Sequence, residues 1–112
     1  MKSFKIALAQ FSPHIGNIEA NAQKMLDQIN EAKKQKADLI LFPELSTVGY
    51  PAEDLLLRPS LAKRTQKAFE LLSQVKDIVM VFGFVNQSEE GHRYNSAAVM
   101  KDGQVLGVYN KQ

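Results

Sequence analysis

The sequence predicts an α/β fold, with a mixed sheet and two helices on one of its faces. Short apolar runs have the length of strands, two longer stretches repeat apolar residues every three or four positions, and an Asp-Gly pair separates the last two runs. The elements follow one another as β-α-β-α-β-β-β. Because parallel strands need a long crossover and antiparallel strands only a tight turn, this order predicts a sheet that is parallel first and antiparallel later.

The first half of the chain predicts a strand, a helix and a second strand. Residues 4–10 place apolar side chains on both faces of a strand, and Asn17 is the expected N-cap of a helix with one apolar stripe. Residues 39–42 are an unbroken apolar run, so we expect residues 38–42 to form a strand that is buried on both faces. Pro43 should end that strand because proline has no N–H to donate to the ladder.

A long connection and a second helix follow. The connection, 44–60, comes after a strand, where α/β proteins tend to build their sites. Ser60 is the expected N-cap of a helix whose apolar stripe reaches Val75. The third strand, 78–85, is again apolar on both sides, and residues 89–91 should form a turn.

Two antiparallel strands are expected near the end of the chain, at 94–100 and 104–109. The Asp102-Gly103 pair between them is the strongest hairpin signal in the sequence, and we expect Gly103 in the turn and Gly107 at a bulge. The strands are apolar on both faces, yet only two helices are available to cover them. A second copy of the chain or a further part of the protein must therefore shield the other face.

Composition narrows the class of protein. The chain has 112 residues, of which 45% are hydrophobic and 23% charged, so it is long enough for one globular domain. A net charge of +2 is too small to favour nucleic acid as a partner. No apolar run approaches the length of a membrane span and no signal peptide precedes the first strand, so we expect a cytoplasmic protein with no membrane partner.

Metal sites and disulfides are not expected in this sequence. The chain has no cysteine, which excludes disulfides and thiolate ligands. His14 and His92 are its two histidines, and each lies in a turn-like segment. Neither has the converging partners that a metal site needs, so both are expected to be surface or loop residues.

Two charged residues follow the ends of predicted strands. Glu44 comes directly after the buried second strand, where a carboxylate is costly unless it is paired or used, and we interpret it as a catalytic base. Lys111 comes after the last strand, and its ammonium could stabilise an oxyanion. If the two strands run the same way in one sheet, both side chains could converge on one cleft. A salt bridge between them is the alternative interpretation.

Three separated segments resemble the first half of a nitrilase-superfamily amidase domain: KIALAQFSPHIGNIEAN, ADLILFPELSTVGY and YNSAAVMKDGQVLGVYNK. The phrase GYPAEDLL is typical of the glutaminase domain of the glutamine-dependent NAD synthetases. The resemblance implies an α-β-β-α sandwich whose subunits associate, so a homo-oligomer is expected. It also implies that residues 1–112 are the N-terminal portion of a single carbon–nitrogen hydrolase domain.

The resemblance implies a mechanism as well. A cysteine attacks the side-chain amide of glutamine, Glu44 accepts its proton, Lys111 steadies the tetrahedral intermediate, and ammonia leaves. In that family the ammonia amidates deamido-NAD to NAD at a separate synthetase domain, where ATP and magnesium are expected. No cofactor is expected within these 112 residues. By analogy Tyr50 would line the glutamine pocket, although a buried tyrosine bonded to the backbone is an equally open interpretation.

The missing cysteine limits what this chain should do alone. In the family the cysteine lies downstream of the lysine, so we expect a fragment that is truncated before the nucleophile and inactive by itself. Ser46, Thr47 and Ser96 have no histidine at a suitable spacing to replace it, and at Asn95-Ser96 we expect a structural hydrogen bond. Two alternatives stay open: another nitrilase-superfamily amidase, such as a carbamoylase or ω-amidase, or a non-catalytic α/β association module.

Overall fold

The computed structural model describes residues 3–10, 12, 17–43, 61–87 and 93–111, which form one sheet and two helices. The predicted element order β-α-β-α-β-β-β is confirmed for these residues. The elements are β1 (Ile6–Leu8), α1 (Ile18–Lys34), β2 (Leu39–Leu41), α3 (Leu61–Leu72), β3 (Val79–Gln87), β4 (Arg93–Lys101) and β5 (Gln104–Lys111).

The five strands lie side by side in the order of the sequence, β1-β2-β3-β4-β5. The pairs β1–β2 and β2–β3 are parallel, and the pairs β3–β4 and β4–β5 are antiparallel. The predicted change from parallel to antiparallel pairing is therefore confirmed. Two reversals between β3 and β5 mean that β5 runs in the same direction as β2, which is the condition that the predicted site requires.

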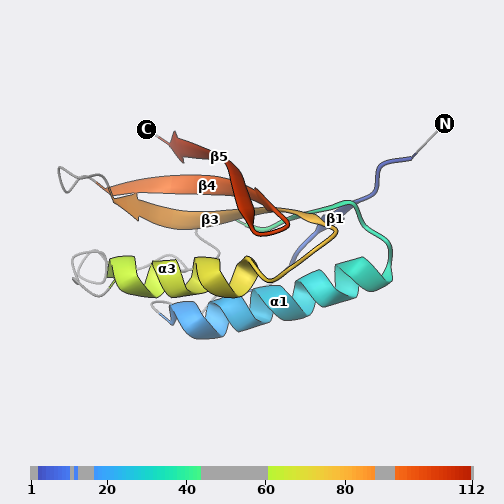
Figure 1. Ribbon diagram of the computed structural model, residues 1–112, viewed down its shortest axis with the longest axis horizontal. Coiled ribbons are helices and arrows are strands. Elements are labelled where there is room, and N and C mark those ends of the chain that lie inside the picture. The colour runs from blue at the N-terminus through green and yellow to red at the C-terminus, as the bar shows by residue number, and fades with distance from the viewer. Residues whose placement is uncertain (1–2, 11, 13–16, 44–60, 88–92, 112) are drawn as a thin grey trace.

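Both helices pack against one face of the sheet (Figure 1). The core between the layers is formed by Met25, Ile29 and Leu72 from the helices and by fully buried residues of the central strands, among them Ile40, Met80 and Phe82. The Phe69 ring packs edge-on against Phe82 and Phe84, with centroid separations of 5.2 and 4.9 Å. The prediction of two helices on one face is confirmed.

The opposite face of the sheet carries no helix and exposes large apolar side chains. Ile6, Leu8, Leu41 and Tyr109 are 55%, 71%, 41% and 71% exposed. They alternate along their strands with residues that face the helices, as the two-residue period of a strand requires. We call this surface the open face. Its exposure is what the sequence predicted for a sheet that is apolar on both sides and has only two helices.

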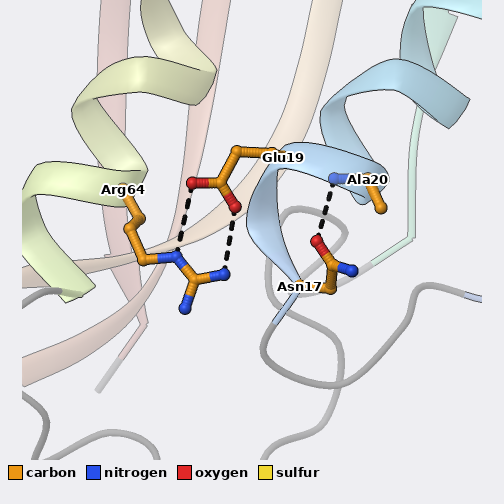
Figure 2. A network of polar contacts seen from close by, with 4 residues as sticks. All are labelled: Asn17, Glu19, Ala20 and Arg64. Atoms are coloured by element: carbon orange, nitrogen blue, oxygen red, sulfur yellow. Dashed lines mark hydrogen bonds and ion pairs between the residues drawn. The ribbon is translucent and has the colours of Figure 1, made fainter.

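Local signals at the helix start and at the hairpin are confirmed. The Asn17 side chain accepts a hydrogen bond from the Ala20 N–H at 3.1 Å, which satisfies a free donor at the start of α1 (Figure 2). Asp102 and Gly103 have φ of +50° and +83°, as the tight turn between β4 and β5 requires. A Cβ at Gly103 would also lie 2.9 Å from the Ser73 carbonyl oxygen, so the turn needs glycine for two reasons.

The predicted bulge lies beside Gly107. Val99 pairs with Gly107 and Met100 pairs with Val105, which leaves Leu106 as an extra residue in β5. An extra residue bends its strand and increases the local twist. Beyond it, β5 rises from the sheet on the side away from the helices (Figure 1).

Several element boundaries differ from those predicted. The first strand is only Ile6–Leu8 because its partner β2 is equally short, and Pro43 lies two positions beyond the end of β2. The second helix ends at Leu72 in turns of the i to i+3 type, although Val75 beyond it is still buried. The last strand does not stop at Tyr109 but continues to Lys111, because Asn110 and Lys111 pair with β4. The expected cap at Ser60 and the turn at 89–91 lie outside the described residues.

No helix among the described residues is long and apolar enough to cross a lipid bilayer.

An ion pair joins the two helices. Arg64 of α3 donates to Glu19 of α1 through Nε to Oε1 at 3.4 Å and Nη2 to Oε2 at 3.0 Å (Figure 2). The hydrogen bond from Arg64 is the main reason why the pKa of the Glu19 carboxyl lies below its ordinary value of 4.5. Water reaches both side chains, which are 34% and 45% exposed, so the pair contributes no more than about 1 kcal/mol.

This pair should make part of the stability depend on pH. Because the Glu19 pKa is lowered in the folded state, its contribution is present above pH 4.5 and is lost as the pH falls through the lowered pKa. We therefore expect Arg64→Ala to reduce the free energy of urea unfolding at pH 7 by up to about 1 kcal/mol, and by less near pH 3. An equal effect of Arg64→Ala at both pH values would mean that the ion pair contributes nothing.

Candidate functional site

A pocket of about 240 Å³ opens beside the ends of β2 and β5. Three segments of neighbouring strands and one residue of β5 form its walls. The lining residues are Leu41, Phe42, Pro43, Val81, Phe82, Gly83, Asn95, Ser96, Ala97 and Tyr109. Leu41 and Tyr109 belong to the open face. The strand registers place Val81, Gly83, Asn95 and Ala97 on the same side of the sheet, so the pocket lies mainly on the side away from the helices.

The strands bring distant parts of the chain to this pocket. Pro43 lies two positions after Leu41, the last residue of β2, and the intervening Phe42 still donates from its N–H to the Val81 carbonyl at 2.9 Å. Tyr109 belongs to β5, three strands away in the sheet order, or roughly 14 Å in a flat sheet. Tyr109 nevertheless lines the same pocket as Pro43, because β5 bends away from the helices after the bulge at Leu106.

The predicted site residues stand in different relations to the pocket. Glu44 lies outside the described residues, but it is the next residue after Pro43, which lines the pocket. Lys111 is the last residue of β5, and its cross-strand partner Asn95 also lines the pocket. Tyr50 lies outside the described residues. The structure thus places the chain neighbour of Glu44 and the pairing partner of Lys111 at one pocket, while the roles of all three residues stay predictions.

The described lining of the pocket is uncharged. Its side chains are apolar except for Asn95, Ser96 and Tyr109. A surrounding of this kind disfavours the charged form of a carboxyl group and strengthens electrostatic interactions. Any charged side chain that enters the pocket would therefore have a strong effect on a bound molecule.

Three polar side chains join the last three strands beside the pocket. Asn110 Oδ1 accepts hydrogen bonds from Ser96 Oγ at 2.5 Å and from Asn86 Nδ2 at 3.1 Å. We call Asn86, Ser96 and Asn110 the asparagine clamp. Its Ser96 bond confirms the predicted structural hydrogen bond at that position, and Ser96 is only 3% exposed. Ser46 and Thr47, the other hydroxyl residues considered as nucleophiles, lie outside the described residues.

The sequence interpretation missed the clamp partners and Tyr109. Asn86 and Asn110 are separated by 24 positions, and nothing in the sequence shows that they meet. Tyr109 could have been found, since it lies two positions before Lys111 and alternate residues of a strand share a face.

Metal-ligand clusters are absent from the described part of the chain. There, no group of three or more histidine, aspartate or glutamate side chains could hold a metal ion. His14 and His92 both lie outside that part.

Residues 5–112 match the family model for carbon-nitrogen hydrolase. A glutamine-dependent NAD(+) synthetase from Acinetobacter baylyi is 82% identical over 111 residues, which are 99% of this chain and 20% of that protein. Another from Thermotoga maritima is 39% identical over 114 residues, covering 99% of this chain and 19% of that protein. The chain spans about a fifth of the length of the curated relatives it matches.

Solved structures of the same kinds of enzyme also match this chain. A glutamine-dependent NAD+ synthetase from Acinetobacter baumannii, in complex with ADP, matches with a TM-score of 0.95 and 80% identity over 99% of this chain and 21% of that chain. An amidase from Nesterenkonia sp., of the nitrilase superfamily, matches with a TM-score of 0.86 and 26% identity over 96% of this chain and 42% of its own. The predicted resemblance is confirmed, and this chain belongs to the carbon–nitrogen hydrolase family.

Proposed function

We propose that this chain is the N-terminal portion of the glutaminase domain of a glutamine-dependent NAD synthetase. The observation that carries the proposal is the 82% identity to such an enzyme over 99% of the chain. The function of the proposed parent is to release ammonia from glutamine and to use it for the ATP-dependent amidation of deamido-NAD to NAD. Its place in the cell would be the cytoplasm.

Glu44 and Lys111 are the proposed catalytic residues of the glutaminase reaction. A cysteine thiol attacks the side-chain amide carbon of glutamine, Glu44 accepts the thiol proton, and the ammonium of Lys111 stabilises the resulting oxyanion. Glu44 then returns this proton to the amide nitrogen, and collapse of the intermediate forms a thioester and releases ammonia. The apolar pocket beside Pro43 supports this assignment, because such surroundings raise the pKa of a carboxyl group toward that of an effective base. Tyr50 is proposed to line the glutamine site.

The nucleophile must come from the remainder of the enzyme, since none of the 112 residues is a cysteine. One solved structure of the Nesterenkonia amidase carries an acrylamide adduct at the active-site cysteine of that protein. The open face also supports a domain that extends past these 112 residues, because an apolar surface of this extent is normally covered by other parts of a protein. We propose that the remainder of the same domain covers it, that ATP and magnesium bind at the separate synthetase domain, and that the subunits form a homo-oligomer.

A simple amidase is the second candidate. The Nesterenkonia amidase favours it, because this chain matches that protein with a TM-score of 0.86 over 42% of its length. A simple amidase would hydrolyse its substrate without ATP and would not transfer the ammonia.

The test uses the full-length enzyme, made as this chain continued by the remainder of the Acinetobacter baylyi relative. We expect NAD formation from deamido-NAD and ATP with either glutamine or ammonium chloride as the nitrogen source. We expect no hydrolysis of glutamine by the 112-residue chain alone, because it has no cysteine. Amide hydrolysis by the full-length enzyme with no NAD formed from glutamine would favour the simple amidase and reject the proposal.

A further inference from the structure

The asparagine clamp holds β5 at its last position before Lys111. Asn110 Oδ1 accepts from a residue of β4 and from a residue of β3, so a single oxygen links the three antiparallel strands. The bond to Ser96 joins residues that are paired in register. The bond to Asn86 reaches past β4 to the next strand. Both bonds lie one residue away from the proposed catalytic lysine.

A serine at position 96 is not what core packing alone would select. Ser96 is 3% exposed and shares the helix-facing side of β4 with Ala98 and Met100, which are 0% and 2% exposed. Burial of a hydroxyl group costs free energy unless the group is hydrogen-bonded, and the shorter of the two bonds that Ser96 Oγ donates goes to Asn110 Oδ1, at 2.5 Å against 3.4 Å to the Tyr94 carbonyl. The polar group therefore serves to fix Asn110 rather than to improve the core.

Few other contacts among the described residues restrain the last residues of β5. In the described sheet β5 is an edge strand that pairs with β4 alone, and residues 101–110 are exposed. The bulge at Leu106 also bends β5 away from the helices, so packing on the core does not hold its last residues.

We propose that Asn110 is a positioning residue for Lys111, and that the asparagine clamp fixes the strand end from which the lysine reaches the oxyanion. This inference rests on the proposed function, in which Lys111 stabilises the tetrahedral intermediate. Stabilisation of an oxyanion requires a donor at hydrogen-bond distance. A misplacement of about 1 Å lowers the rate on the order of 10²-fold.

The experiment compares Asn110→Leu with Asn110→Asp in the full-length enzyme. Leucine has a similar shape but no acceptor, whereas aspartate keeps an oxygen that can accept from Ser96 and Asn86. We expect Asn110→Leu to lower kcat with glutamine about 10- to 100-fold. KM and ammonia-dependent NAD synthesis should stay within about twofold, because the oxyanion forms only during the glutaminase reaction. Asn110→Asp should keep most of the kcat with glutamine that the unmodified enzyme has.

Val108→Ala is the matched control. Val108 lies on the same strand and the same face, and it pairs with Ala98 as Asn110 pairs with Ser96. This variant removes apolar contact without removing a hydrogen bond, and we expect kcat with glutamine to be unchanged. If Val108→Ala lowers kcat as much as Asn110→Leu does, the effect is a general weakening of β5 and the proposal is overturned.

A double-mutant cycle shows whether Asn110 acts through Lys111. When the lysine is already replaced, the clamp has no ammonium to position, so Asn110→Leu combined with Lys111→Ala should be as active as Lys111→Ala alone. Losses that multiply, or a parallel loss of ammonia-dependent synthesis in Asn110→Leu, would overturn the proposal. A failure of the proposed function is distinct from either result, because the unmodified full-length enzyme would then form no NAD from glutamine.

Discussion

Glu44→Gln is expected to abolish the use of glutamine by the full-length enzyme and to leave its use of free ammonia intact. A positioned general base accelerates proton transfer by about 10²–10⁴-fold, and glutamine keeps the size of the side chain without accepting the thiol proton. NAD formation with glutamine should fall by this factor. NAD formation with ammonium chloride should not change, because the proposed synthetase site is separate. The measurement is the ratio of the two rates.

Glu70→Gln is a suitable control for the glutamate replacement. Glu70 is an exposed residue of α3, and its replacement also removes one negative charge. We expect both rates to equal those of the unmodified enzyme. If Glu44→Gln lost activity with ammonia and with glutamine in equal measure, Glu44 would not be the glutaminase base.

Lys111→Ala is also expected to lower NAD formation with glutamine and to leave NAD formation with ammonium chloride unchanged. Removal of one donor from an oxyanion typically costs about 10²–10³-fold in kcat. Because the donor is needed only once the carbonyl carbon becomes tetrahedral, kcat should fall far more than KM rises. The steady-state constants with glutamine and the rate with ammonium chloride together measure this effect.

Lys101→Ala provides the comparison for the lysine. Lys101 is exposed at the opposite end of β4 and pairs with Gln104, so its replacement removes the same charge far along the hairpin. We expect no change in either rate. A rise in KM for glutamine at unchanged kcat in Lys111→Ala would instead assign Lys111 to substrate binding.

Much of this fold follows from local signals. Asp102-Gly103 predicts a turn with positive φ at both residues, and the hairpin forms there. Asn17 predicts the start of α1 because its side chain satisfies a backbone donor of the first turn. The boundaries of the elements were less predictable than their types. The apolar pattern of the second helix continues to Val75, yet the helix ends at Leu72, since burial can continue after regular structure stops.

The candidate site was partly predictable from local signals in the sequence. Glu44 and Lys111 attract attention because each follows an apolar strand, and the shared direction of β2 and β5 agrees with one site. The asparagine clamp gives no such signal. Asn86 and Asn110 meet because the registers of β3, β4 and β5 align them, and those registers depend on the hairpin turn and on the bulge at Leu106.

The open face reverses the usual guide to which substitutions a protein tolerates. Exposed positions normally accept polar residues at little cost. Ile6, Leu8 and Leu41 are exposed in these 112 residues, so by that guide they would be counted as tolerant. In a protein whose remaining layers cover that surface, a charged residue at any of them would be buried without a partner. A mutational scan of the full-length enzyme should therefore rank these three positions with the core.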